Sequence, residues 1–247
     1  MQLEQFEAHA RLEERHWWFT ARRAILLRIL QAIARPGSPV ADVGCGTGGN
    51  AAALARAGYE VLGLDPSPEA IALAVERFPK VGFRCTDRPA DARAHLARQG
   101  TLLMTDVLEH VEGDRELLHD AVEATPRGGH LLLTVPADPS LWSGHDVAFG
   151  HKRRYVAASF RALWAEEPVA ERLCSHYNAR LWPLIAAVRR VGTRGGGGGD
   201  LDVPVGPLNA VFRAVFQSEA GALVSALDRG AAPFARGVSL VALLRKQ

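Results

Sequence analysis

The sequence predicts an α/β fold whose core is a doubly wound, mostly parallel sheet. Between residues 40 and 135, five short apolar segments alternate with stretches of helical spacing. A glycine-rich turn follows the first apolar segment, and acidic residues close the next three. Strands that alternate with helices form βαβ units with right-handed crossovers, so this pattern favours a parallel sheet with helices on both faces.

Two helices are predicted before the first strand. Apolar residues recur at helical spacing over residues 3–17, and a clearer amphipathic stripe runs over residues 25–33. Pro36 and Gly37 break the second pattern. We therefore expect residues 1–36 to form a helical lid that precedes the sheet.

The turn after the first strand has the composition of a nucleotide-type cofactor site. Gly44, Gly46 and Gly48 carry no side chains, so the backbone can approach a ligand closely, and the next helix adds N–H donors at its start. Gly44, Gly46 and Gly49 also match the G-x-G-x-x-G spacing of NAD-binding domains. The turn alone therefore does not identify the cofactor.

Polar residues end the following strands at the edge where open α/β sheets bind ligands. Asp65 closes the strand predicted over residues 59–64, and its carboxylate can accept hydrogen bonds from both hydroxyls of a ribose. Asp87 closes the next strand and suits an adenine amino group. Asp106 ends the fourth strand, which runs into Val107.

In order and spacing, these motifs closely resemble class I methyltransferases that use S-adenosylmethionine (SAM). The segment from Asp42 to Gly48 resembles their first motif, and residues 126–129 resemble their turn into the fifth strand. The resemblance implies a Rossmann-like sheet of seven strands, with residues 169–175 and 238–244 as the last two and the final strand antiparallel. It implies SAM as cofactor and S-adenosylhomocysteine (SAH) as product. The cofactor-binding residues expected are Asp42, Gly44, Cys45, Gly46, Gly48, Asp65, Pro66, Ser67, Asp87, Asp106 and Val107.

The same glycine turn is also compatible with a nicotinamide-dependent enzyme, which is the alternative function. A short-chain dehydrogenase needs a Tyr-x-x-x-Lys pair. None of Tyr59, Tyr155 and Tyr177 has a lysine four residues later. The sequence therefore favours the methyltransferase.

Length, composition and charge agree with one catalytic domain. The chain has 247 residues, 48% of them hydrophobic, with a net charge of +2. We divide residues 1–247 into the helical lid (1–36), a SAM-binding core (37–136) and a substrate-side half (137–247). The basic residues form no dense stripe, so a nucleic-acid partner is not expected.

Localisation follows from cysteine use and from the lack of long apolar runs. Cys45, Cys85 and Cys174 are an odd set without metal-ligand spacing, which predicts reduced thiols in a cytoplasmic protein. The charged start does not resemble a signal peptide, and no apolar run reaches the length of a bilayer span. Stable membrane insertion is therefore not expected.

The substrate-side half contains a helix predicted over residues 156–166, a flexible loop of five glycines at 195–199, and an apolar helical face over residues 208–227. That face has two interpretations. It is either a helix that packs on the sheet or caps the pocket, or a lip that receives a lipid-like acceptor or touches a membrane surface. It can equally cover a twofold partner, so a homodimer stays open.

Two aromatic and polar motifs are the candidates for acceptor binding. The first is the run from His16 to Phe19, in which successive rings point about 100° apart on a helix, so at least one faces a ligand or lid. The second runs from Leu141 to Tyr155 beyond the fifth strand. Together they resemble a bacterial, ubiquinone-type branch of these methyltransferases that acts on small molecules. The substrate-binding residues expected are Trp17, Trp18, Phe19, Trp142, Asp146, Arg154 and Tyr155.

The resemblance and these motifs predict methyl transfer to a small-molecule acceptor, with a hydroxyl of a natural product, glycan or lipid-linked metabolite as the favoured target. A hydroxyl needs a base, and His145 is the first candidate because Asp146 can orient its ring. His110 and His151 follow. The alternatives are C- or N-methylation and a SAM-binding accessory protein without turnover.

No metal site is predicted. His145, Asp146 and His151 offer nitrogen and oxygen ligands, but their spacing matches no standard zinc pattern. The Asp/Asp/Asn set of magnesium-dependent enzymes is not found either.

Overall fold

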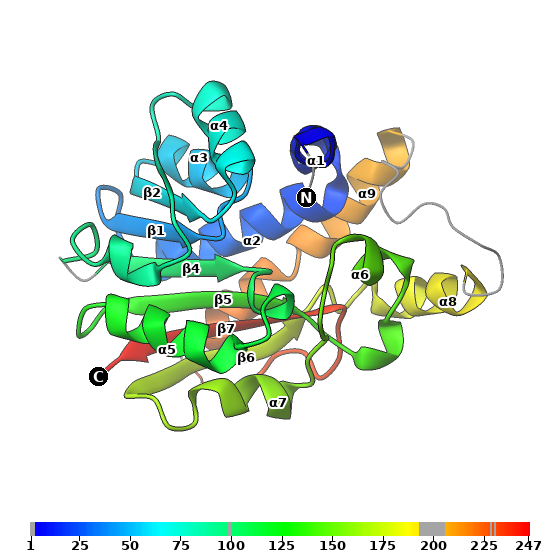
Figure 1. The fold of residues 1–247 in the computed structure, drawn as a ribbon. Coiled ribbons are helices and arrows are strands. Elements are labelled where there is room, and N and C mark those ends of the chain that lie inside the picture. Colours follow the sequence, from blue (N-terminus) through cyan, green and yellow to red (C-terminus); the bar gives the residue numbers. More distant parts are fainter. Residues whose placement is uncertain (1–2, 98–99, 193–205, 228, 230) are drawn as a thin grey trace.

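The computed structural model describes residues 3–97, 100–192, 206–227, 229 and 231–247 (Figure 1). Its centre is a seven-stranded sheet of order β3-β2-β1-β4-β5-β7-β6. Strands β1 to β5 pair in parallel, and β7 is antiparallel to both β5 and β6. The predicted fold class is confirmed. The strands are β1 (Pro39–Val43), β2 (Glu60–Asp65), β3 (Gly82–Cys85), β4 (Thr101–Thr105), β5 (His130–Pro136), β6 (Val169–Tyr177) and β7 (Ser239–Lys246).

The central strands are apolar on both faces, as expected for a parallel sheet covered on two sides. On β4, Leu102 and Met104 pack into one core layer, and Leu103 packs into the other. Successive residues of a strand point to opposite faces, so each strand contributes to two separate layers. The two layers hold the helices on either side of the sheet.

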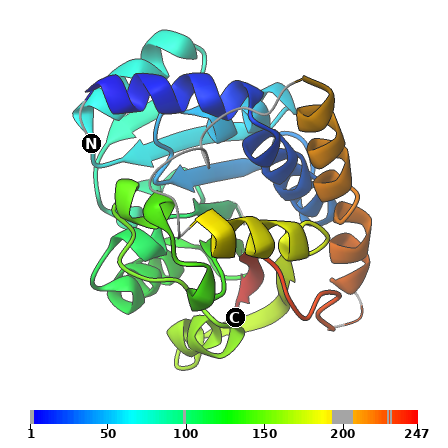
Figure 2. The ribbon, with the colours of Figure 1, turned by 90° about the vertical axis from the view of Figure 1, so that its right-hand side faces the viewer.

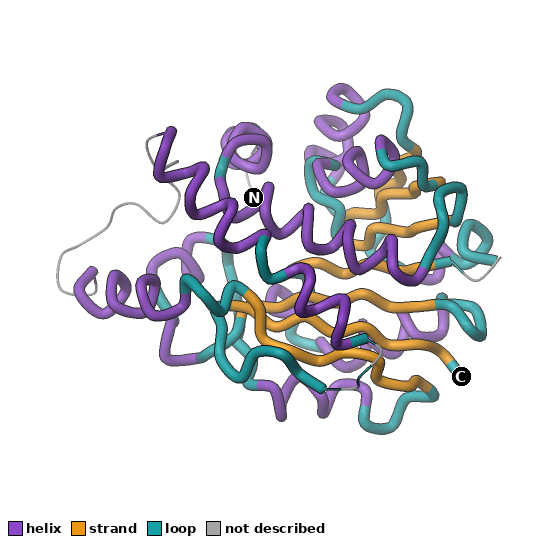
Figure 3. The backbone as a smooth tube through the Cα atoms, turned by 180° about the vertical axis from the view of Figure 1, so that it is seen from behind, coloured by secondary structure: helices purple, strands orange, loops and turns teal. Residues whose placement is uncertain are grey.

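Helices α5 (Asp114–Ala124) and α7 (Ala157–Arg161) cover one face, and α2 (Trp17–Ile33) and α10 (Ala220–Ala226) cover the other (Figure 3). The helix predicted over residues 156–166 is shorter than expected, because its backbone changes to a 3-10 turn at Ala162. The other helices are α1 (Leu3–Arg15), α3 (Gly49–Arg56), α4 (Pro68–Arg77), α6 (Gly144–Ala148), α8 (Trp182–Gly192) and α9 (Gly206–Gln217). Short 3-10 turns span Pro89–Ala92, Leu108–His110, Pro139–Leu141 and Ala162–Trp164.

Helices α1, α6 and α8 lie around the edge where the parallel strands end (Figure 2). Helix α9 packs along α2, where Phe216 is buried against Trp17 and Tyr177. This contact supports the interpretation of the apolar face as a helix packed on the domain. The glycine run at 195–199 lies outside the described residues.

Within the part of the chain that the structure describes, no helix combines the length and apolarity needed to cross a membrane.

Candidate active site

A cavity of about 480 Å³ opens at the carboxyl edge of the sheet. The ends of the strands form its floor, α1 and the start of α2 form one wall, and residues 149–154 and α8 form another. Asp106 and Asn178, which follow β4 and β6 directly and line the cavity, both have positive φ. Such strained backbone in non-glycine residues clusters at functional sites.

The glycine turn and Asp65 form one side of this cavity. The N–H of Gly46 donates to Asp65 Oδ2 at 2.8 Å, and the N–H of Ser67 donates to Oδ1 at 2.9 Å. Ser67 also caps α4, since its Oγ accepts from the N–H of Ala70 at 3.2 Å. The two backbone hydrogen bonds hold the Asp65 carboxylate in a fixed position. Burial raises the pKa of Asp65, and the same two donors oppose that shift.

The position of Gly44 has no room for a side chain. Its φ is +73°, and a Cβ atom there would overlap the side chain of Val107. Gly44, Cys45, Gly46, Pro66 and Val107 all line the cavity. Burial raises the pKa of the Cys45 thiol, which keeps it protonated.

Three of the predicted cofactor residues lie away from the cavity wall. Asp42 is fully buried beneath the turn, where burial raises its pKa to about 7 against the opposing charge of Arg22. Gly48 packs against Phe83, and Asp87 is exposed. None of the three is among the residues that line the cavity.

The aromatic run at the start of α2 reaches the cavity with all three rings. Trp17, Trp18 and Phe19 line it, and Arg22 lies 4.5 Å from the centre of the Trp18 ring. Arg22 also forms a buried ion pair with Asp106 at the end of β4. The aromatic residues and this ion pair therefore lie side by side where the α2 wall meets the strand ends.

A buried carboxylate on α1, which the sequence does not reveal, joins this helix to the glycine turn. Glu13 on α1 accepts from Thr47 Oγ1 at 2.8 Å and from Arg77 at 2.5 Å. Arg77 also donates to the carbonyl of Thr47 at 2.7 Å. The glycine turn is thereby linked to both α1 and α4.

Asp146 orients His151, whereas the sequence predicted that it would orient His145. Asp146 Oδ1 accepts from His151 Nδ1 and from Arg154 Nε, each at 2.8 Å. Burial alone would raise the pKa of Asp146, but hydrogen bonds from His151 and Arg154 outweigh burial and lower it. His151 and Arg154 line the cavity, Asp146 lies behind them, and His145 lies on α6 with a side chain outside the described part.

Two other predicted substrate residues do not line the cavity. Trp142 is 40% exposed. Tyr155 is buried in the core, where its hydroxyl donates to Asp114 Oδ2 at 2.7 Å. A residue close in sequence to residues that line the cavity therefore need not line the cavity itself.

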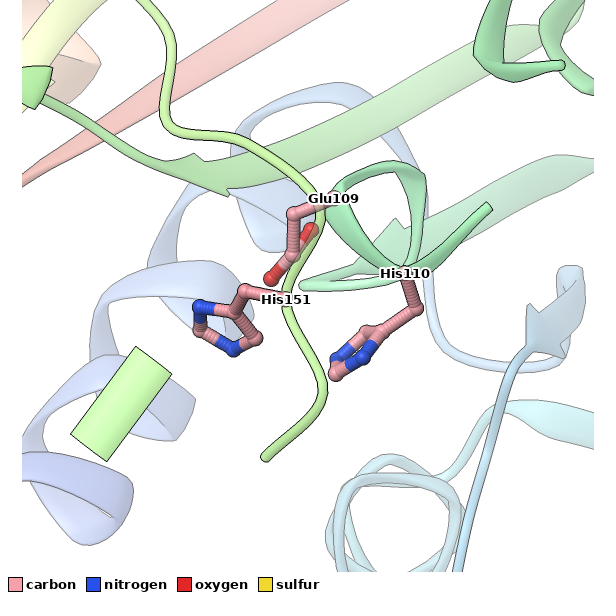
Figure 4. Close-up of side chains that lie close together, drawn as sticks. All are labelled: Glu109, His110 and His151. Carbon is pink, nitrogen blue, oxygen red and sulfur yellow. The ribbon is translucent and has the colours of Figure 1, made fainter. Parts of the chain in front are cut away.

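Glu109, His110 and His151 point toward a common space at the cavity wall (Figure 4). The imidazole rings of His110 and His151 lie edge to face, with their centres 4.8 Å apart. Burial raises the pKa of Glu109 to about 8, and burial with the nearby His151 lowers the pKa of His110 to about 4. Glu109 was not among the predicted site residues. Its position next to His110, just after the fourth strand, is the sequence signal that could have identified it.

The arrangement is a cofactor-type turn and a polar cluster in one cavity, and comparison with known proteins assigns it to a family. A family model described as "Methyltransferase domain" matches residues 15–185. The chain belongs to this methyltransferase family. The matched range contains the glycine turn, Asp65 and the Glu109, His110 and His151 cluster.

Relatives of this methyltransferase include a demethylmenaquinone methyltransferase of Tropheryma whipplei (strain Twist), 32% identical over 155 residues. That match covers 61% of this chain and 55% of the relative. A ubiquinone biosynthesis O-methyltransferase of Azoarcus sp. (strain BH72) is 32% identical over 103 residues, covering 40% of this chain and 44% of the relative. The matched part thus spans about half the length of these curated relatives.

Solved structures share the fold of the methyltransferase. The plantazolicin methyltransferase BamL, solved with a desmethyl substrate analogue and SAH, aligns with a TM-score of 0.60 at 14% identity, over 98% of this chain and 91% of that one. A TehB-like SAM-dependent methyltransferase from Corynebacterium glutamicum aligns with a TM-score of 0.52 at 18% identity, covering 91% and 87%. At these identities the likeness shows the fold alone.

Proposed function

We propose that this protein transfers the methyl group of SAM to a hydroxyl of a small-molecule acceptor. The observation that carries the proposal is that the glycine turn with Asp65 and the cluster of Glu109, His110 and His151 line one cavity. A donor held at the turn and an acceptor held at the cluster would therefore share one enclosed space.

Asp65 and the glycine turn are the proposed site of the adenosine part of SAM. The fixed carboxylate of Asp65 would accept hydrogen bonds from the ribose hydroxyls, and Gly46, where a Cβ atom would have no atom within 4 Å, leaves room for the ligand beside the backbone. The ion pair of Arg22 and Asp106 offers one positive and one negative group to the carboxylate and ammonium of the methionine part. Cofactor recognition thus depends on groups at the ends of three strands and on the lid.

The acceptor is proposed to lie between the aromatic residues of the lid and the polar cluster. Trp18, Phe19 and Phe149 supply apolar surface, and His110 and His151 face the reacting hydroxyl. Methyl transfer breaks the bond between sulfur and methyl, forms the bond between oxygen and methyl, and leaves SAH as a neutral thioether. Because the sulfonium is already electrophilic, alignment and exclusion of water contribute most of the rate, and the cluster is where the hydroxyl loses its proton.

The test is turnover of a panel of hydroxylated, aminated and carbon-acid acceptors with SAM, with products identified by mass spectrometry. We expect O-methylated products, and a fall of about 10²-fold or more in kcat for His151→Ala. SAM affinity should stay within about twofold in that variant. Exclusive C- or N-methylation would contradict the hydroxyl assignment, and SAM binding without any turnover would favour an accessory protein.

A further inference from the structure

We propose that Glu109, His110 and His151 bind a divalent metal ion, best matched by Zn²⁺, which holds the acceptor hydroxyl. The proposal rests on the proposed function and deepens it. Each of the three residues offers one ligand atom, and these atoms lie within 4.8 Å of one another. Zinc requires ligand distances of about 2.0–2.2 Å, so binding would draw these atoms inward around a common ion.

The kinds of donor atom favour a metal of borderline softness. Two imidazole nitrogens and one carboxylate oxygen form a common catalytic zinc set, which leaves a coordination position open for water or substrate. Magnesium and calcium prefer sites made of oxygen ligands only. The composition of the cluster therefore favours zinc over those two ions.

Glu109 provides an independent argument for a ligand at this place. Its side chain is fully buried at the cavity wall, and neither carboxylate oxygen has a hydrogen-bond partner among the described residues. A buried polar group without a partner costs free energy, and a buried carboxylate costs more. A bound cation would satisfy this carboxylate directly.

His151 is held as metal-binding histidines usually are. The hydrogen bond to Asp146 engages Nδ1, so Nε2 is the nitrogen that His151 would offer to an ion. Asp146 is fixed in turn by Arg154, whose Nε and terminal nitrogen reach its two oxygens at 2.8 and 3.0 Å. A carboxylate behind a histidine sets the ring orientation and raises its basicity as a ligand.

The backbone already joins the two segments that supply the ligands. Glu109 and His110 lie on the 3-10 turn Leu108–His110, which follows β4, and the N–H of Lys152 donates to the carbonyl of Glu109 at 2.7 Å. This bond connects the turn to the segment that carries His151. The ligands therefore come from two segments of backbone that this hydrogen bond connects.

In this form of the reaction, the ion would lower the pKa of the coordinated hydroxyl. The hydroxyl proton passes to solvent water, the oxygen attacks the methyl carbon, and the sulfur keeps the electron pair of the broken bond. The sequence considered His145 and Asp146 as ligands with His151. The structure instead engages Asp146 with Arg154 and His151, so Glu109 and His110 replace the other two candidates.

The test is metal binding by the full chain after treatment with a chelator. Zn²⁺ is titrated by calorimetry, and Co²⁺ is titrated as a probe whose visible absorption reports coordination by nitrogen and oxygen. We expect saturable binding with one ion per chain, weakened about tenfold or more in Glu109→Gln, His151→Ala and Asp146→Asn. The matched control is His119→Ala, because His119 forms an exposed pair with Glu167 at 3.0 Å outside the cavity; its ion affinity should equal that of the unmodified chain.

Turnover separates this proposal from the proposed function. We expect the chelator-treated protein to bind SAM with unchanged affinity, to lose acceptor turnover, and to recover turnover on addition of Zn²⁺. SAM binding by Glu109→Gln shows that this variant is folded. Equal Zn²⁺ affinity in Glu109→Gln, His151→Ala and the unmodified chain would overturn the metal site. Full turnover in the presence of chelator would overturn its catalytic role while leaving the proposed methyl transfer standing.

Discussion

Backbone groups fix the proposed cofactor half of the cavity, made of residues 44–46 and 65–67, whereas side chains build the proposed acceptor half. The carboxylate of Asp65 is held by two backbone N–H groups from the glycine turn and from Ser67. The acceptor half consists of Glu109, His110 and His151, and its geometry depends on the side chains of Asp146 and Arg154. The geometry of the cofactor half should therefore tolerate side-chain substitutions elsewhere in the chain. The geometry of the acceptor half should depend on a few charged side chains.

The largest expected effect is the loss of the Asp146 carboxylate. Asp146→Ala leaves the guanidinium of Arg154, which is 2% exposed, without its buried partner. Removing one partner of a buried ion pair costs about 3–5 kcal/mol of unfolding free energy. Urea or thermal denaturation measures the change.

Glu7→Ala is the control for that variant, because Glu7 forms an exposed pair with Arg11 at 3.9 Å. Its Tm should stay close to that of the unmodified chain. Equal losses of stability in the two variants would show that the Asp146 network does not hold the acceptor half together.

The next effect concerns the carboxylate that we assign to the ribose. Asp65→Ala should weaken SAM binding by about 1–3 kcal/mol through the loss of charge-assisted hydrogen bonds. Asp87→Ala is the comparison, since Asp87 is exposed and away from the cavity wall. Calorimetry on both variants decides whether the adenine role predicted for Asp87 stands, because unchanged affinity in Asp87→Ala would remove it.

A smaller effect should follow from adding one methyl group to the glycine turn. Gly44→Ala forces an alanine to a φ of +73° and brings its Cβ against Val107, whereas Gly37→Ala has a similar φ of +85° with no atom within 4 Å. Both variants should lose about 1–2 kcal/mol of stability from the backbone conformation. Only Gly44→Ala should also weaken SAM binding, and an equal affinity in the two would contradict the close approach of cofactor and turn.

A separate effect concerns how the stability of the fold depends on pH. Burial raises the pKa of Asp42 to about 7, so the folded state binds a proton that the unfolded chain releases near pH 4. The stabilisation from this proton is complete below pH 4 and is lost as the pH rises to about 7. Asp42→Asn should flatten this part of the curve of unfolding free energy against pH, and an unchanged slope would exclude Asp42 as its source.

The fold and the cofactor half could be predicted because their signals are local in the chain. The alternation that places Leu102 and Leu103 in different core layers is visible within one strand, and the glycine turn lies beside the strand it follows. The same locality explains why the sequence alone pointed to Asp65, which the structure places at the cavity wall.

The acceptor half could not be predicted in detail because its contacts join residues with no common pattern. Glu109 meets His151 only through the path of the chain after β5. In the sequence, His145 directly precedes Asp146, and His151 follows five residues later. The turn after α6 brings His151 to the Asp146 carboxylate. Such choices depend on tertiary geometry, which spacing does not determine.

The central claim is that the cavity binds SAM through its cofactor half, independently of the acceptor half. Calorimetric titration of SAM, SAH and NADH into the unmodified chain and into His151→Ala tests it most directly. We expect micromolar binding of SAM and SAH by both proteins and no binding of NADH. Binding of NADH alone would contradict the claim and return the glycine turn to a nicotinamide cofactor.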